Sequence, residues 1–130
     1  MLTEKDYCDY DTCVALKELG ITDCSLQYYE KSCPNTLRRN LFQPLTIRTA
    51  EALGRVLAIS LYNAQKWLRE EKQIEVVVLG EKEIGGPYYA DIYTESGYAG
   101  YVHKPCEKYE EALSEGIKEV VKILKEENND

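Results

Sequence analysis

The strongest constraint on the fold is an apolar stripe near the C-terminal end of this 130-residue chain. Apolar and small residues recur there at three- and four-residue spacing: Tyr109, Ala112, Leu113, Gly116, Ile117, Val120, Val121 and Leu124. The spacing predicts a long amphipathic helix that buries one face against the rest of the protein. Gly116 lies on that stripe, although glycine costs a helix interior about 1 kcal/mol relative to alanine. We therefore expect another part of the backbone to approach closely at Gly116.

Three segments upstream of this helix have the composition of strands. Ile74 to Leu79 is rich in β-branched residues, and two tyrosine-rich segments follow at Tyr88 to Thr94 and Tyr98 to His103. Glycine and proline punctuate the first connection, whereas Glu95, Ser96 and Gly97 predict a tight hairpin in the second. Successive short connections of this kind predict an antiparallel meander.

The first half of the chain carries weaker patterns. We predict a helix over Asp11 to Leu19, capped by Asp11 or Thr12 and ended by Gly20, and a short strand over Leu26 to Glu30. The prolines and asparagine between Cys33 and Pro44 predict an irregular connection. The remaining predictions are a short helix over Thr49 to Leu57, a helix over Leu61 to Lys72 with Ser60 as N-cap and Trp67 in the core, and a frayed tail over Glu126 to Asp130.

Length and composition fit one domain. The chain has 44% hydrophobic and 30% charged residues, which is typical of a globular protein, and its length suits a single core. The sequence therefore predicts one α+β domain over residues 1–130, with an antiparallel meander of three or four strands packed against helices. No apolar leader or spanning segment is recognisable, so we expect a cytoplasmic protein that does not enter membranes.

The charge is acidic but unevenly distributed. Of a formal net charge of -7, residues 36–72 contribute seven basic and three acidic side chains, a local +4 that leaves -11 elsewhere. An acidic protein repels phosphate backbones at long range, which makes nucleic acid an unfavourable partner. The basic residues Arg38, Arg39, Arg48 and Arg55 are nevertheless candidates for contact with an anion.

Reactive residues form no recognisable catalytic or metal motif. The five cysteines, Cys8, Cys13, Cys24, Cys33 and Cys106, lack the close pairs of a zinc knuckle, and we expect them to be reduced thiols without metal. His103 and Cys106 are the one nucleophile-like pair, but a proline lies between them and no third orienting group is evident, so we interpret them as a plain structural junction. Phosphate-binding glycine loops are absent from the sequence. We predict no catalytic residues and no cofactor.

The chain contains many tyrosines, and some of their rings are expected on the surface. Five of the eleven tyrosines fall in the last two predicted strands, where alternation sends Tyr89 and Tyr93 to one face and Tyr88 to the other. If the terminal helix covers only one face, rings on the other face stay exposed. Tyr89, Tyr93 and Tyr101 are therefore candidates for an interaction surface, with amphipathic filling of the strands as the alternative.

Three stretches, Tyr7 to Gly20, Ser60 to Val78 and Tyr109 to Leu124, resemble a group of small proteins of unknown function encoded in prophage-like and mobile regions of gut anaerobes. The residues YCDYDTCVALKELG, SLYNAQKWLREE followed by IEVVV, and YEEALSEGIKEVVKIL carry the resemblance. It implies a capped first helix, a helix leading into a strand, and a final amphipathic helix after a meander. The region Cys33 to Leu57 departs most from that pattern, and no activity or binding residue follows from the resemblance.

Two fold analogies bear on function. The order of helix, three strands and helix from Leu61 onward resembles a double-stranded-RNA-binding domain, but Glu107, Glu110 and Glu111 stand where such a domain needs lysines. The last strands and EALSEGIKEVV are similar to HicB-type antitoxins at the level of the fold. We expect a non-enzymatic accessory or protein-interaction domain of a mobile element, which binds a protein partner or itself. The alternative is a nucleic-acid-associated or antitoxin-like regulator that uses Arg38 to Arg55.

Overall fold

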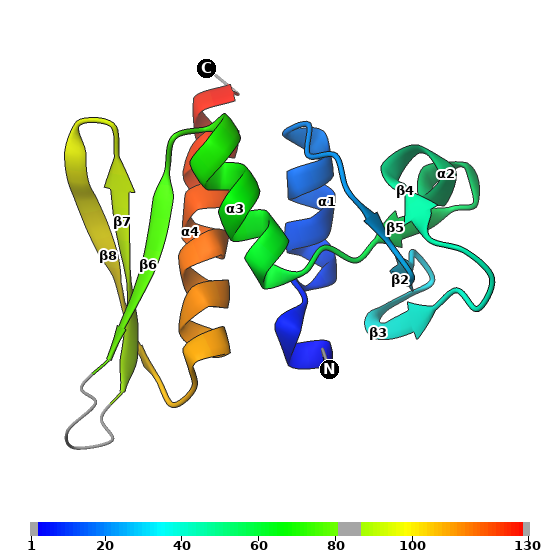
Figure 1. Cartoon of the computed structure of the whole chain (residues 1–130), viewed down its shortest axis with the longest axis horizontal. Coiled ribbons are helices and arrows are strands. Elements are labelled where there is room, and N and C mark those ends of the chain that lie inside the picture. The colour runs from blue at the N-terminus through cyan, green and yellow to red at the C-terminus, as the bar shows by residue number, and fades with distance from the viewer. Residues whose placement is uncertain (1–2, 81–86, 129–130) are drawn as a thin grey trace. The chain divides into compact units, whose positions relative to one another are not determined.

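The computed structural model describes residues 3–80 and 87–128, and only the backbone at residues 98, 101–104 and 128. The chain divides into two compact units, Met1–Ser60 and Leu61–Asp130. Each unit combines helices with antiparallel strands, which confirms the predicted α+β class (Figure 1). The single domain over residues 1–130 stays a prediction.

The second unit contains the predicted meander between two helices. Its sheet has the order β6-β7-β8, and both pairings are antiparallel. The hairpin between β7 and β8 turns at Glu95 and Ser96, and Gly97 has a φ of +111°. The bounds of the elements are α3 Leu61–Glu71, β6 Glu75–Gly80, β7 Tyr88–Thr94, β8 Gly97–Cys106 and α4 Tyr109–Asn128.

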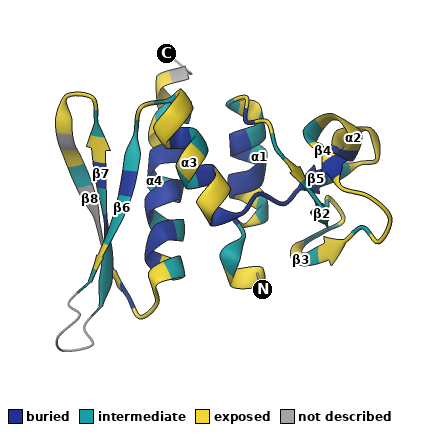
Figure 2. Ribbon diagram, viewed as in Figure 1, coloured by how far each residue is buried: buried dark blue, intermediate teal, exposed yellow. Residues whose placement is uncertain are grey.

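The predicted apolar stripe of α4 forms the core of this unit. Leu113, Ile117 and Val120 are buried, and α4 contacts all three strands of the sheet (Figure 2). A β-carbon on Gly116 would meet Val76 of β6 and Ala90 of β7, so the expected close approach at this glycine is confirmed. The helix continues to Asn128, and fraying of the tail stays a prediction.

Helix α3 is tied to the start of the sheet by polar contacts. The Gln65 side-chain amide donates a hydrogen bond of 2.7 Å to the Val76 carbonyl, and Arg69 pairs with Glu75 at 3.6 Å. Trp67 is only half-buried, and the Lys72 ammonium lies 5.5 Å from its ring centroid. The prediction of Trp67 as a core residue was wrong because Leu61, Ala64 and Leu68 occupy the buried face of the helix.

The first unit begins with a short 3-10 helix, η1 (Glu4–Asp6), and the helix α1 (Tyr10–Glu18). Asp9 is the N-cap of α1, accepting a hydrogen bond from the Thr12 backbone N–H at 2.9 Å, so the predicted caps, Asp11 or Thr12, lie two or three residues too late. Gly20 ends the helix with a φ of +100°, as predicted. The Ile21 N–H reaches back to the Leu16 carbonyl at 3.1 Å, which places Ile21 in the core.

The rest of this unit is built from five short strands and one helix. The sheet has the order β3-β2-β5, and β1 pairs separately with β4. The elements are β1 Cys24–Ser25, β2 Gln27–Glu30, β3 Cys33–Arg39, β4 Leu45–Thr46, α2 Ile47–Ala52 and β5 Arg55–Leu57.

Two predictions for this region were wrong. Residues 33–39 form the strand β3 and not an irregular connection, because Pro34 lies on an edge strand, where a missing N–H is tolerated. The predicted helix over Thr49 to Leu57 stops at Ala52, since Gly54 takes a φ of +73° and turns the chain. Val56 and Leu57 then pair with β2 and are buried in the sheet.

The strand β2 is buried on both faces. On one face Tyr28 packs with Leu45, Ala50 and Leu57 from the strands and helix that follow. On the other face the Tyr29 hydroxyl donates a hydrogen bond of 2.8 Å to the Cys8 carbonyl, and the Tyr10 ring stands edge-on at 6.2 Å. The first unit therefore has its own core on each side of a small sheet.

Within residues 3–80 and 87–128, no helix combines the length and apolar character needed to cross a membrane.

Candidate interaction surface

Two of the candidate tyrosines, Tyr89 and Tyr93, lie on one face of β7, as the alternation predicts. Ala90 and Ile92 of β7 are buried, whereas Tyr89, Asp91 and Tyr93 alternate with them and are at least partly accessible. Tyr93 is 37% exposed, and Leu79, which pairs with Tyr89, is 49% exposed. The side chain of Tyr101 lies outside the described residues, although its backbone pairs with Asp91.

The four candidate arginines do not form one cluster. Arg38 pairs across the sheet with Tyr28, and Arg39 pairs with Gln27, so the two side chains leave β3 on opposite faces. The Arg55 guanidinium lies 4.3 Å from the Tyr28 ring centroid and is partly buried there. Arg48 stands apart on α2, near two carboxylates. A phosphate backbone would therefore meet these charges singly.

The candidate thiols are mostly enclosed. Cys8, Cys13 and Cys106 are buried, and Cys106 is only 4% exposed, which leaves its sulfur little access to a substrate. The His103 side chain lies outside the described residues.

Burial, together with the nearby thiols of Cys13 and Cys8, raises the pKa of Tyr29 well above its ordinary value, so this hydroxyl stays protonated and holds its hydrogen bond.

Among the residues whose side chains the structure describes, the most exposed large apolar ones lie in the loop between β3 and β4, residues 40–44, which we name the apolar loop. Leu41 is 82% exposed and Phe42 is 93% exposed, and Figure 2 colours the connection between β3 and β4 as exposed. The Asn40 side-chain amide donates a hydrogen bond of 2.9 Å to the Gln43 carbonyl. The Asn40 backbone N–H also donates to the Leu26 carbonyl at 2.7 Å, and Leu45 at the other end is buried. The loop is therefore anchored at both ends.

Sequence reasoning missed this loop, because no helix or strand pattern includes Leu41 and Phe42. The available signal was local. Two adjacent large apolar residues stand between Asn40 and Pro44, a setting that favours a turn and places such residues outside any periodic core.

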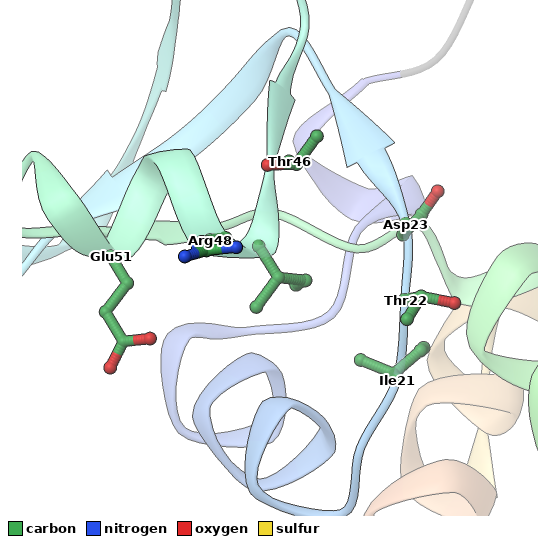
Figure 3. A pocket seen from close by; sticks show the side chains of 7 residues that line it. Ile21, Thr22, Asp23, Thr46, Arg48 and Glu51 are labelled. Carbon is green, nitrogen blue, oxygen red and sulfur yellow. The ribbon is translucent and has the colours of Figure 1, made fainter.

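The same unit contains a hollow of about 360 Å³, which we name the apolar hollow. Figure 3 shows Ile21, Thr22 and Asp23 on one side, and Thr46, Arg48 and Glu51 on the other. The turn after α1 places the first group. The second group is placed by mutual hydrogen bonds between Thr46 and Thr49, which cap α2. Ile47 completes the lining, which is largely apolar.

The rim of the apolar hollow carries both signs of charge. Asp23 and Glu51 contribute two carboxylates and Arg48 one guanidinium. Glu51 also pairs with Lys17 of α1 at 3.7 Å, an exposed contact that salt and water weaken.

No metal centre is evident in the part of the chain that the structure describes, where no three His, Cys, Asp or Glu side chains come together. Comparisons with protein-family models, curated proteins and solved structures found no match to this chain.

Proposed function

We propose that this chain is a non-enzymatic protein-interaction protein, an accessory of a mobile element, which binds another protein chain through the apolar loop. The observation that carries the proposal is the exposure of Leu41 and Phe42, at 82% and 93%. When a partner covers adjacent large apolar side chains that project from an anchored loop, the removal of their surface from water is favourable. An aromatic residue so placed is a typical anchor of a protein interface.

The surroundings of the loop suit an interface. Arg38 and Arg39 directly precede it and are exposed, so an apolar tip is flanked by guanidinium groups. Arginine and aromatic side chains are enriched at interfaces, where arginine combines stacking with directed hydrogen bonds. The favoured partner surface is an apolar pocket with acidic groups at its rim.

The nucleic-acid alternative receives less support from the geometry. Arg38 and Arg39 leave the strand on opposite faces, and Arg48 lines the apolar hollow together with Asp23 and Glu51. Phosphate recognition works best when several cations face one surface, because each contact adds to the release of counterions. These arginines therefore fit single contacts with a protein better than a track along a duplex.

A site-specific photo-crosslinker tests the proposal. The crosslinking residue replaces Gln43, beside Leu41 and Phe42, and the chain is expressed in its native host. We expect a discrete adduct that disappears when Leu41→Ser and Phe42→Ser are added. The matched control is Leu53→Ser, which removes an apolar side chain that is 58% exposed in the same unit. Equal adducts in the double variant and in the control, or no adduct at all, would contradict the proposal.

A further inference from the structure

We infer that the partner of the apolar loop is a second copy of this chain, whose apolar hollow receives Leu41 and Phe42. The inference rests on the proposed function and names the partner of the same loop. Both halves of the contact, a projecting apolar pair and a largely apolar hollow, are present on one unit.

The loop does not fill the hollow of its own chain. Phe42 is 93% exposed, a value that leaves its ring in contact with almost none of the surrounding protein. The hydrogen bonds of Asn40 to Leu26 and to Gln43 hold the base of the loop, and buried Leu45 holds its end. A loop held in this way meets the hollow of another molecule without unfolding its own strands.

The hollow matches the loop in size and chemistry. Its volume of about 360 Å³ lies at the small end of the range for ligand sites, which suits one or two side chains. Of the two isoleucines in its lining, Ile21 is only 3% exposed and Ile47 is half-buried, so Ile47 is the wall against which an aromatic or leucine side chain buries apolar area. Phe42 is the natural anchor, and Leu41 beside it extends the contact.

The charges around the two halves are complementary. The loop is preceded by Arg38 and Arg39, and no acidic residue occurs between Cys33 and Arg48. The hollow carries the carboxylates of Asp23 and Glu51 beside the guanidinium of Arg48, and the pair of Glu51 with Lys17 at 3.7 Å is weak enough for another cation to replace Lys17. In the docked arrangement these carboxylates lie within reach of Arg38 or Arg39, a local attraction that opposes the long-range repulsion between two chains of net charge -7.

A contact between two different surfaces is a head-to-tail contact. In such an assembly each copy uses its loop on one neighbour and its hollow on another. Association therefore continues until a ring closes or no unbound copy remains. A loop in a hollow covers less than the usual area of a stable dimer, so we expect weak association that depends on protein concentration.

The test uses two variants of the full chain that each lose a different half. Leu41→Ser with Phe42→Ser removes the loop tip, and Thr22→Arg fills the hollow from an exposed position without touching the core. Sedimentation velocity over about a hundredfold range of concentration measures association. We expect the unaltered chain to associate, and each variant alone to associate at least about tenfold more weakly.

The decisive measurement is the mixture. The loop variant keeps its hollow and the hollow variant keeps its loop, so an equimolar mixture has one working contact and should form a one-to-one heterodimer and nothing larger. Leu53→Ser and Thr36→Arg, at exposed positions outside both halves, are the matched controls and should associate like the unaltered chain.

Three outcomes overturn the inference. These are a monomer at every concentration, unaltered association of either variant, and a mixture that stays monomeric. If the purified chain is monomeric while the crosslinker at position 43 captures a different protein in the host, only the second copy is refuted. If the crosslinker captures nothing as well, the proposed function fails with it.

Discussion

Gly116 of α4 and Val76 of β6 are so close that a β-carbon on Gly116 would lie 2.5 Å from the Val76 Cγ1 atom. The same β-carbon would lie 2.8 Å from that of Ala90 on β7. Two adjacent strands therefore occupy the space that any other residue at position 116 would need. The helix stands close to the sheet because this position carries no side chain.

Gly116→Ala should destabilise the protein. Alanine normally favours a helix interior by about 1 kcal/mol over glycine, but overpacking against Val76 and Ala90 should cost about 1 to 3 kcal/mol and prevail. Urea unfolding followed by circular dichroism measures the difference. Lys122→Ala, at an exposed position of the same helix, is the control and should stay within about 0.5 kcal/mol. A Gly116→Ala variant as stable as the unaltered chain would show that the sheet yields at this contact.

Ile117→Ala should lower the free energy of unfolding by about 2 kcal/mol or more, because its fully buried side chain leaves a cavity. Val120→Asp should cost at least as much, since it buries an unpaired charge. Glu115→Ala and Lys118→Ala remove one weak surface pair at 3.8 Å and should change stability by no more than about 0.5 kcal/mol. Unfolding midpoints in urea separate the two groups. An unchanged midpoint for Ile117→Ala combined with loss of a dimer would identify the stripe as an interface.

Tyr29→Phe should change the alkaline limit of stability. The pKa of Tyr29 is raised above 10.0 in the folded chain by burial, so its neutral form stabilises the fold fully below pH 10. Above that pH the unfolded chain loses the proton first, and stability falls by at most about 1.4 kcal/mol per pH unit for this one group. The Phe variant should lack this part of the slope.

At neutral pH the same variant should lose about 1 kcal/mol through the missing hydrogen bond to the Cys8 carbonyl. Thermal melts between pH 8 and pH 11 provide both readings. Tyr62→Phe, at a residue that is 41% exposed, is the control. A Tyr29→Phe slope equal to that of the control would mean that the Tyr29 hydroxyl does not control the alkaline limit.

Removing metal should leave the protein unchanged. The five cysteines form no disulfide in the structure, and three of them are buried. Native mass spectrometry should give the mass of the bare chain, and EDTA should leave the melting temperature where it was. One bound zinc per chain, or a melting temperature that falls with chelator, would refute this prediction.

Duplex DNA and RNA should bind weakly or not at all. The net charge of -7 opposes a phosphate backbone, and the arginines are dispersed. Fluorescence anisotropy at low salt measures binding. Sub-micromolar affinity that falls steeply with salt, and that an Arg38→Ala, Arg39→Ala double variant abolishes, would favour the regulator over the interaction protein.

The second unit could be predicted from local patterns. The apolar stripe on α4, the β-branched run of β6 and the turn residues before β8 each constrain their own neighbourhood, and all agree with one meander covered by a helix. Alternation likewise predicted that Tyr89 and Tyr93 share a face. Where local preference and tertiary packing agree in this way, the sequence alone is sufficient to predict the secondary structure and its arrangement.

The first unit depended on tertiary structure. Residues 33–39 have little strand preference, and they become β3 only because β2 offers a partner and an edge position tolerates Pro34. The segment after Gly54 became a strand because it pairs with β2, and this pairing buries Val56 and Leu57 on opposite faces of the sheet. Long-range pairing determined these elements, and no short window of sequence contains it.

The apolar loop and the apolar hollow also depend partly on the local sequence and partly on the tertiary structure. The chain's amino acids alone determine that Leu41 and Phe42 stand together between a turn-forming Asn40 and Pro44, and that Gly20 ends the first helix. Only the folded chain decides that the loop projects into solvent and that Ile21 and Ile47, far apart in sequence, line one hollow. The physical reason is that exposure and concavity belong to surfaces assembled from distant segments, whereas turns and helix ends are set by neighbouring residues.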